Sequence, residues 1–138
     1  MSRYYVDNVK DGKKIYYIIR SNDDSSIIKE PTKYLKHKMQ QHRSPNTVRR
    51  LAYALTYYMD YLDEIEVTVQ QILDMKYAEQ HEHFVSFLNW LQVGKHCDRT
   101  KIANNNTCNS YLQTVLGYYL FLIMEYEQMS DIKVLERR

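Results

Sequence analysis

Residues 44–64 read SPNTVRRLAYALTYYMDYLDE, and this stretch decides the fold. The hydroxyl of Ser44 can accept a hydrogen bond from a free backbone amide, while Pro45 has no amide that would need a partner at the first helical position. Apolar residues then recur at intervals of three and four, which is the period of one helical face. The stretch therefore predicts a helix to about Asp63. Its predicted inward stripe is Val48, Leu51, Leu55, Tyr58, Met59 and Leu62.

The same pattern returns in the second half of the chain. Residues 104–110 form another polar start, and the spacing Leu-x3-Leu-x-Tyr-Tyr of residues 51–58 recurs at residues 112–119. We expect a helix from about Thr107 to Gln128, and a central one because it is apolar on nearly all sides. Its predicted inward residues are Leu112, Val115, Leu116, Tyr119, Leu120, Ile123 and Met124.

The N-terminal part predicts a small hairpin followed by a first helix. Tyr4–Val9 and Lys14–Ile19 are β-favouring runs, and Asp11-Gly12 between them suits the positive φ angles of a tight turn. A two-stranded hairpin is marginal in water, so it should pack on the helices, pair with another chain or be partly disordered. A helix is expected from Pro31, which suits a first helical position, to Gln41. Tyr34, Leu35, Lys38 and Met39 bring an apolar seam with lysines beside it.

Two further helical segments are predicted between the repeated patterns. Thr68 caps a short turn through Leu73, and a helix follows from about Tyr77 to Gln92, with Gly94 as its stop signal. The predicted core residues of that helix are Phe84, Phe87, Leu88, Trp90 and Leu91.

The composition agrees with a mostly helical protein. The 138 residues are 44% hydrophobic and include three Gly and two Pro, which suffices for one compact core but is too few turn residues for a many-stranded sheet. No stretch approaches the roughly eighteen apolar residues of a membrane span, and the N-terminus lacks a basic start with an apolar run. We therefore predict a soluble, unsecreted protein of the mostly α class, an orthogonal bundle of four to five helices with a small N-terminal β-hairpin.

Residues suited to metal or nucleotide chemistry are sparse. Cys97 and Cys108 are too few for a disulfide framework and are expected to be reduced. His81 and His83, two residues apart, point to different faces of a helix, and His96 beside Cys97 lacks a paired-ligand spacing. The three glycines are scattered, so no phosphate-binding loop is predicted. The sequence predicts no metal and no cofactor.

The net charge of +2 conceals a segregation along the chain. Residues 29–50 carry seven Lys and Arg against one Glu, whereas residues 60–82 carry seven Asp and Glu against one Lys. One face can therefore meet a polyanion and another a basic protein surface. The alternative is that both runs are simply solvated charge.

The succession of these segments resembles a known family. Residues 44–62, then Phe84 to Leu91, then Asn106 to Phe121 are similar to the N-terminal core-binding, SAM-like domain of tyrosine recombinases and phage integrases. The resemblance covers about Pro31 to Glu127. A Ser-Pro-x-Thr helix start alone is common, but its succession by a Phe-x2-Trp-Leu helix and a Thr-x-Asn-x-Tyr-Leu helix is much less so.

The resemblance implies a helical domain that covers one face of duplex DNA, while a separate catalytic domain closes the clamp and performs strand exchange. Residues 1–28 would then be a hairpin extension and connector, residues 29–128 the DNA-binding domain, and residues 129–138 the start of a linker to an absent catalytic domain. The expected partners are duplex DNA and neighbouring recombinase protomers in a tetrameric synapse, with no membrane and a monomeric isolated domain. The implied location is the cytoplasm of a prokaryote, at the nucleoid, and the type of mobile element stays open.

Helix starts and basic side chains are the candidate DNA contacts. A helix N-terminus attracts phosphate through its free amides and partial positive charge, and Arg49 and Arg50 add formal charge. Plain capping is the alternative for Ser44, Asn106 and Thr107, and an exposed helix face is the alternative for the two arginines. We expect both starts to lie side by side on one duplex-facing surface. The predicted DNA-binding residues are Lys36, Arg43, Ser44, Asn46, Thr47, Arg49, Arg50, Tyr53, Lys101, Asn106, Thr107, Asn109, Ser110 and Gln113; their short polar groups can reach phosphates or base edges.

Catalysis by this chain is not expected. The family uses a tyrosine nucleophile with surrounding cations, but most of the fourteen tyrosines follow helical core periodicity and no segment supplies that cluster. An independent enzyme is therefore the weakest hypothesis. The main alternative is a helical protein interaction module without DNA binding, which predicts an exposed apolar patch. The acidic stretch and the hairpin are candidate contacts between protomers.

Overall fold

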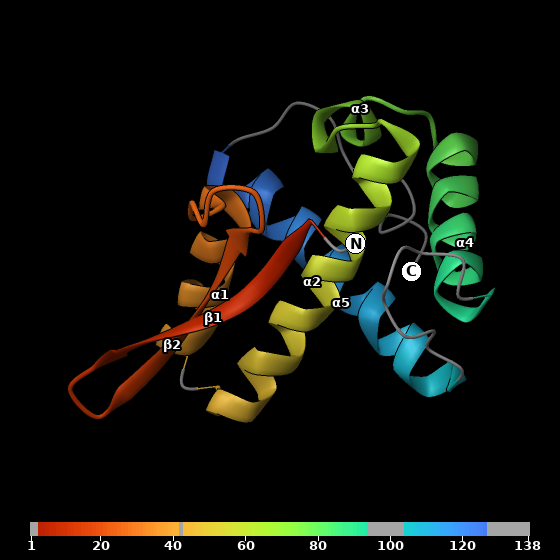
Figure 1. The fold of residues 1–138 in the computed structure, drawn as a ribbon. Helices are drawn as coiled ribbons and strands as arrows, with labels where there is room; N and C mark the ends of the chain where they lie inside the picture. Colours follow the sequence, from red (N-terminus) through yellow and green to blue (C-terminus); the bar gives the residue numbers. More distant parts are fainter. Residues whose placement is uncertain (1–2, 42, 94–103, 127–138) are drawn as a thin grey trace. The chain divides into compact units, whose positions relative to one another are not determined.

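The computed structural model describes residues 3–41, 43–93 and 104–126. This part of the chain is mostly helical, with five helices and one pair of antiparallel strands (Figure 1). The fold class predicted from the sequence, mostly α with a small N-terminal hairpin, is confirmed. The elements are β1 (Tyr4–Asp11), β2 (Lys14–Ser21), α1 (Lys29–Gln40), α2 (Pro45–Ile65), α3 (Val69–Leu73), α4 (Tyr77–Val93) and α5 (Asn105–Tyr126).

The chain divides into two compact units, Met1–Asp60 and Tyr61–Arg138, which we call unit 1 and unit 2. The division falls inside α2. Unit 1 contains the hairpin, α1 and most of α2, whereas unit 2 contains the last residues of α2 together with α3, α4 and α5. The two polar helix starts therefore belong to different units.

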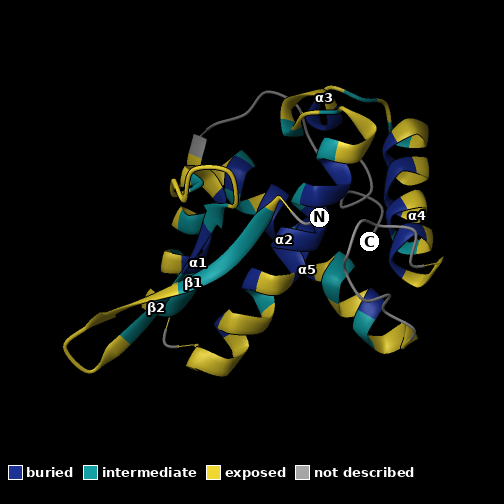
Figure 2. Cartoon of the chain, in the orientation of Figure 1, coloured by how far each residue is buried: buried dark blue, intermediate teal, exposed yellow. Residues whose placement is uncertain are grey.

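The hairpin is anchored at one end and exposed at the other. Its strands pair from Tyr4↔Ser21 to Asp11↔Lys14, and Gly12 in the turn has a φ of +63°, a left-handed conformation that glycine adopts without a Cβ clash. The turn extends past α1 in Figure 1 and is exposed in Figure 2. At the other end Ile18 and Ile19 are buried, and β2 contacts α1. Of the three possibilities that the sequence left open for the hairpin, the structure shows packing on a helix.

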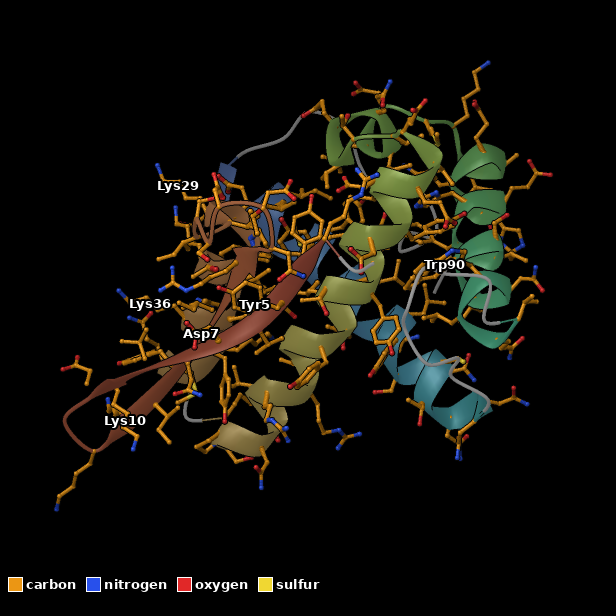
Figure 3. All side chains as sticks on the ribbon, viewed as in Figure 1. Tyr5, Asp7, Lys10, Lys29, Lys36 and Trp90 are labelled. Carbon is orange, nitrogen blue, oxygen red and sulfur yellow. The ribbon has the colours of Figure 1, made fainter. Side chains whose placement is uncertain are left out.

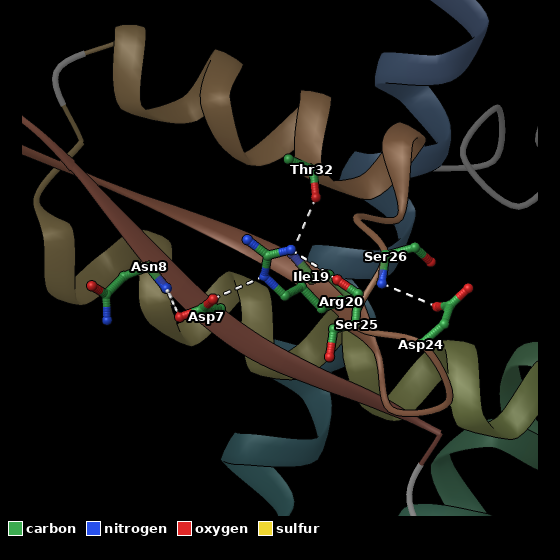
Figure 4. A network of polar contacts seen from close by, with 8 residues as sticks. All are labelled: Asp7, Asn8, Ile19, Arg20, Asp24, Ser25, Ser26 and Thr32. Atoms are coloured by element: carbon green, nitrogen blue, oxygen red, sulfur yellow. Dashed lines mark hydrogen bonds and ion pairs between the residues drawn. The ribbon is translucent and has the colours of Figure 1, made fainter.

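Polar contacts tie the base of the hairpin to its surroundings (Figure 4). The Arg20 Nε donates to Asp7 Oδ2 across the strands at 2.9 Å, and its Nη1 donates to the Ser25 carbonyl at 2.8 Å. This hydrogen bond with the Arg20 guanidinium lowers the pKa of the Asp7 carboxyl. The Ile19 amide donates to Thr32 Oγ1 at 3.1 Å, which links β2 to the first turn of α1. These contacts hold the two strands to each other and attach β2 to α1.

Helix α1 begins two residues earlier than expected. Lys29 is its first residue, so Pro31 occupies the third helical position and not the first. The first amides of a helix have no partner inside it, so proline at the third position still breaks no hydrogen bond. Tyr34 and Leu35 are buried as predicted, and burial raises the pKa of Tyr34 to about 12.

Helix α2 is exposed at its start and covered on every side in its middle. Four of its six predicted inward residues, Val48, Leu55, Tyr58 and Leu62, are buried, whereas Leu51 and Met59 are half-buried. All residues from 54 to 58 are buried. Asp60 is buried too, at 3% exposure, and accepts a hydrogen bond from the Arg3 amide at 2.9 Å. Asp60 is therefore not part of the acidic surface expected from residues 60–82.

Two glutamines form hydrogen bonds at α3, one at the start of the helix and one between α4 and α3. Thr68 caps α3 as predicted: its Oγ1 accepts from the Gln71 amide at 3.2 Å, while Gln71 Oε1 accepts from the Thr68 amide at 2.8 Å. Gln80 is fully buried, and its Nε2 donates to the Ile72 carbonyl at 3.0 Å. This hydrogen bond links α4 to α3. Hydrophobic periodicity does not predict the burial of Gln80, because glutamine is polar.

An aromatic cluster fills the core of unit 2. The ring of Tyr61 lies 5.4 Å from that of Phe87 and 5.2 Å from that of Trp90, measured between centroids. The Trp90 Nε1 donates to Glu64 Oε2 at 2.6 Å, so this buried indole keeps its hydrogen bond. Phe84, Phe87, Trp90 and Leu91 are buried as predicted, whereas Leu88 is half-buried.

His83 lies in the same cluster. Its ring centroid is 5.6 Å from that of Tyr61 and 4.9 Å from that of Phe84. Burial lowers the pKa of His83 from 6.5 to about 4. The imidazole is therefore neutral in the folded protein at neutral pH.

The inward face of α5 is only partly the predicted one. Val115, Leu116 and Tyr119 are buried, but Leu120 is 47% and Met124 is 73% exposed, so these two were wrongly assigned to the core. Leu112 and Ile123 are half-buried. Because α5 is apolar on nearly all sides, residue spacing could not identify its inward face. Its other buried residues are Cys108, Thr114, Tyr118 and Leu122, and the expected ends at Gly94 for α4 and Gln128 for α5 lie outside the described residues.

Truncation of Phe87 should destabilise the protein strongly. Phe87 is fully buried, so Phe87→Ala removes ring contacts and leaves a cavity, which typically costs about 3–5 kcal/mol. The matched control on the same helix is Val85→Ala, because Val85 is 50% exposed and such a change should stay within about 0.5 kcal/mol. Urea unfolding followed by circular dichroism measures both. Similar losses in the two variants would contradict this account of α4.

The His83 environment predicts a loss of stability in mild acid. The unfolded chain binds this proton near pH 6.5, whereas the folded chain binds it only near pH 4, so stability falls as the pH drops from 6.5 to 4. The loss over the full window is about 3 kcal/mol. Urea unfolding of the wild type and of His83→Gln at pH 7 and pH 5 tests this. The variant should lose markedly less stability between these pH values, and equal losses would rule out His83 as the cause.

Candidate nucleic-acid interface

Helix α2 begins with a side-chain cap in unit 1. Ser44 Oγ accepts a hydrogen bond from the Thr47 amide at 3.2 Å and lies 2.8 Å from the Thr47 hydroxyl. The capping expected of Ser44 is therefore confirmed. The first turn of α2 contains no acidic residue, so no side-chain charge there opposes the positive end of the helix dipole.

The exposed face of α2 is made of predicted binding residues. Asn46, Arg49, Arg50 and Tyr53 are all exposed and follow one another at helical spacing, so they share one face. The Arg49 guanidinium lies 5.2 Å from the centroid of the Tyr53 ring, a cation–π contact that orders the two side chains. Thr47 is exposed beside this face. Residues 54 to 58 are all buried, so this exposed face ends at Tyr53.

Further cations are exposed elsewhere in unit 1. Lys36 and Arg43 are exposed, and Figure 3 shows Lys10, Lys29 and Lys36 projecting outward from unit 1. Unit 1 carries twelve Lys and Arg against six Asp and Glu, whereas unit 2 carries seven against eleven. The segregation seen along the sequence is therefore a difference between the two units.

The hairpin turn is a basic feature that the list of candidate residues missed. Lys10, Lys13 and Lys14 are exposed there beside Asp11 as the one acidic side chain of the turn. The signal was present in the sequence as three lysines grouped around Gly12. Whether the hairpin binds accessory DNA or protein stays open at the level of the sequence.

The cap of α5 is Asn104, not Asn106 or Thr107. The Asn104 Oδ1 accepts hydrogen bonds from the Asn106 amide at 2.8 Å and from the Thr107 amide at 3.2 Å. Asn106 and Thr107 therefore occupy the first turn of the helix, and the capping considered for them is wrong. The carboxamide of Asn104 reaches the free amides of the residues two and three positions ahead, which is the usual cap geometry.

The exposed face at the start of α5 is polar but uncharged. Asn106, Asn109, Ser110 and Gln113 are exposed, while Thr107 is half-buried. No charged residue occurs from position 104 to position 123. The start of α5 therefore differs in kind from that of α2, which carries two arginines. Lys101, also predicted to bind, lies outside the described residues.

A groove borders this face within unit 2. It has a volume of about 440 Å³ and lies between α4 and α5. Four of its six lining side chains are amides, and Gln92 Nε2 donates to Asn105 Oδ1 across it at 2.7 Å. The lining residues are Val85, Leu88, Asn89, Gln92, Asn105 and Asn109.

The structure brings together the predicted residues of each start, but in two separate groups. Asn46, Arg49, Arg50 and Tyr53 share a face in unit 1, and a second group forms in unit 2. That the two groups lie side by side on one surface stays a prediction. The second group comprises Asn106, Asn109, Ser110 and Gln113.

Metal-binding side chains and membrane-spanning helices can be checked in the part of the chain that the structure describes. No three His, Cys, Asp or Glu side chains in it gather closely enough to hold a metal ion. Cys108 is a buried free thiol whose pKa is raised by burial, while Cys97 and His96 lie outside the described residues. None of the helices in the described ranges is long and apolar enough to cross a membrane.

Comparisons of the chain with protein-family models, curated proteins and solved structures find no match.

Loss of the α2 cap should weaken the fold modestly. Ser44→Ala leaves the Thr47 amide without its side-chain acceptor, which typically costs about 1 kcal/mol. The matched control is Ser110→Ala, because Ser110 is exposed inside α5 and caps nothing. Its effect on the free energy of unfolding should be close to zero. Thermal and urea unfolding compare the two, and a larger loss in the control would contradict the assigned cap.

Proposed function

We propose that the chain is a non-catalytic DNA-binding domain of a site-specific tyrosine recombinase. The observation that carries this proposal is the start of α2, where Arg49 and Arg50 stand exposed on the first turns of a helix whose first turn contains no acidic residue. Among the described residues neither arginine forms an ion pair with an acidic side chain. Their charge is therefore available to an anion outside the chain.

Phosphate of a nucleic acid is the anion that fits this surface best. The cations are spread over a loop, two helices and a hairpin turn, so they suit a row of charges better than one small ion. Lys36, Arg43, Arg49 and Arg50 would neutralise four phosphates, for a slope of about −3.6 in log K against log salt. Binding would be weak at physiological salt because these contacts are exposed.

The family assignment rests on the resemblance of the helical segments, and the order of elements supports it. A capped α2, an aromatic α4 and a polar-capped α5 follow one another as the resemblance requires. The catalytic half would lie in a partner domain of a longer protein. Neighbouring protomers on DNA and a location at the nucleoid belong to the same proposal.

The burial of tyrosine supports a non-catalytic role for the domain. A tyrosine nucleophile must reach a phosphate, but many of the tyrosines are packing residues. Tyr53, the most exposed of those described, contacts a single arginine. The buried tyrosines are Tyr34, Tyr57, Tyr58, Tyr61, Tyr118 and Tyr119.

A protein-binding role is the second candidate. Leu120 and Met124 lie one turn apart on α5 and are 47% and 73% exposed. Such a pair would support contact with another protein, since the interaction-module hypothesis predicts an exposed apolar patch. The two candidates differ in their salt dependence, because an apolar contact lacks the release of counterions.

Removal of the two α2 arginines should weaken DNA binding uniformly across sequences. For Arg49→Gln plus Arg50→Gln, the salt slope should become about 1.8 smaller in magnitude, since each phosphate contact contributes about 0.9. Fluorescence anisotropy with a labelled duplex at several low salt concentrations measures this slope. Lys76→Gln is the matched control, because Lys76 is an exposed cation of unit 2. Absence of binding by the wild type, or an unchanged slope in the double variant, would refute the proposal.

A further inference from the structure

We propose that the amide face of α5, with the groove between α4 and α5, reads adenine in the major groove of duplex DNA. This inference rests on the proposed function and adds to it a division of roles. The cations of unit 1 would hold phosphates without regard to sequence, whereas unit 2 would select the sequence. The proposal stands on the geometry of the amide row, its lack of charge and the composition of the groove.

The amides form a row on one side of α5. Asn105, Asn109 and Gln113 are exposed at intervals of four residues, so they lie one above another along the helix. From the first to the last, the helix rises about 12 Å. That length corresponds to three to four base-pair steps of about 3.4 Å. A helix of ordinary diameter fits the major groove, so the row is long enough to contact several consecutive bases.

The chemistry of a carboxamide matches adenine. Asn and Gln each offer one acceptor oxygen and a donor NH₂ on the same plane. In the major groove adenine presents an acceptor at N7 beside a donor at N6, whereas guanine presents two acceptors and cytosine a donor. A carboxamide can therefore form two hydrogen bonds with adenine and fewer with the other bases.

The amides are available for such contacts. The side chains of Asn109 and Gln113 form no hydrogen bond with any of the described residues. Asn105 accepts a hydrogen bond from Gln92 through its oxygen, so its NH₂ group still has donors to offer. The bond between the two helices holds one amide in place before any ligand arrives, which lowers the entropy that binding would cost.

The groove also has an apolar wall. Val85 is 50% exposed and lines it together with Leu88, opposite the amides of α5. An A·T pair shows the thymine methyl group in the major groove beside the adenine edge. Amides next to an exposed valine therefore match both halves of an A·T pair.

Phosphate is a poorer occupant of this face. Phosphate contacts are strongest with charged donors, but no charged residue lies between positions 104 and 123. Arg49 and Arg50, which suit phosphate, are in unit 1. Contact with base edges is therefore the use that fits an uncharged amide row.

Selection from a randomised duplex pool tests the inference with the full chain. At low salt the wild type should enrich duplexes with A·T pairs at up to three positions within a span of about four base pairs, each preferred by roughly tenfold. Asn109→Ala plus Gln113→Ala should lose at least two of these preferences and keep the salt slope of the wild type. Gln70→Ala is the control, since Gln70 is an exposed amide of α3. It should enrich the same duplexes as the wild type.

A chemical substitution in the DNA provides the second measurement. Replacing adenine by 7-deaza-adenine in the enriched duplex removes the N7 acceptor, so wild-type affinity should fall about tenfold per read position. The double variant should not respond. Retention of duplexes without sequence preference, the same enrichment by the double variant, or indifference of the wild type to the missing N7 would overturn this inference alone. Failure of the wild type to retain any duplex would overturn the proposed function with it.

Discussion

Burial of the Leu-x3-Leu-x-Tyr-Tyr segments of α2 and α5 is the constraint on which the rest of the structure depends. Leu55 and Tyr58 in one helix, and Leu116 and Tyr119 in the other, are almost fully buried. Because these apolar segments must leave water, the middle of α2 is covered, and the exposed polar side chains of both helices lie mostly in their first turns. Leu120 and Met124 are exposed farther along α5. The polar side chains available for function are therefore concentrated at the two starts, next to the caps that Ser44 and Asn104 provide.

The starts of α2 and α5 both have a side-chain cap, but their exposed residues differ in charge. At α2 the exposed face holds Arg49 and Arg50 within a basic unit, whereas the face of α5 holds Asn109 and Gln113 within an acidic one. Charge acts at long range and regardless of sequence, while amide hydrogen bonds act only at contact distance. A chain with both kinds of surface can be drawn to a polyanion by one and discriminate with the other. The two repeated segments are therefore similar in the apolar residues that they bury, and they differ in the polar residues that they expose.

The sequence predicted those features that have a local cause. The Ser44 and Thr68 caps, the turn at Gly12 and the placement of Trp90 in the core all follow from signals within a few residues. Features that depend on tertiary packing could not be predicted from the sequence. Leu120 and Met124 were assigned inward because α5 is apolar all round, and Asp60 was assigned outward because acids usually are. For the candidate site, sequence predicted the exposed residues of both starts well, but it could not separate Asn104 from its two asparagine neighbours as the cap or show the groove against α4.

Cys108 gives the start of α5 a property of its own. The thiol is buried and its pKa is raised by that burial, although its neighbour Asn109 faces the groove. A thiol-alkylating reagent reacts with the thiolate, so it can reach this sulfur only when the first turns of α5 open. The rate of alkylation at Cys108 is thus a measure of how often the helix start opens. A ligand bound to the adjacent amides would slow that opening, so occupancy of the groove could be measured as slower alkylation of Cys108.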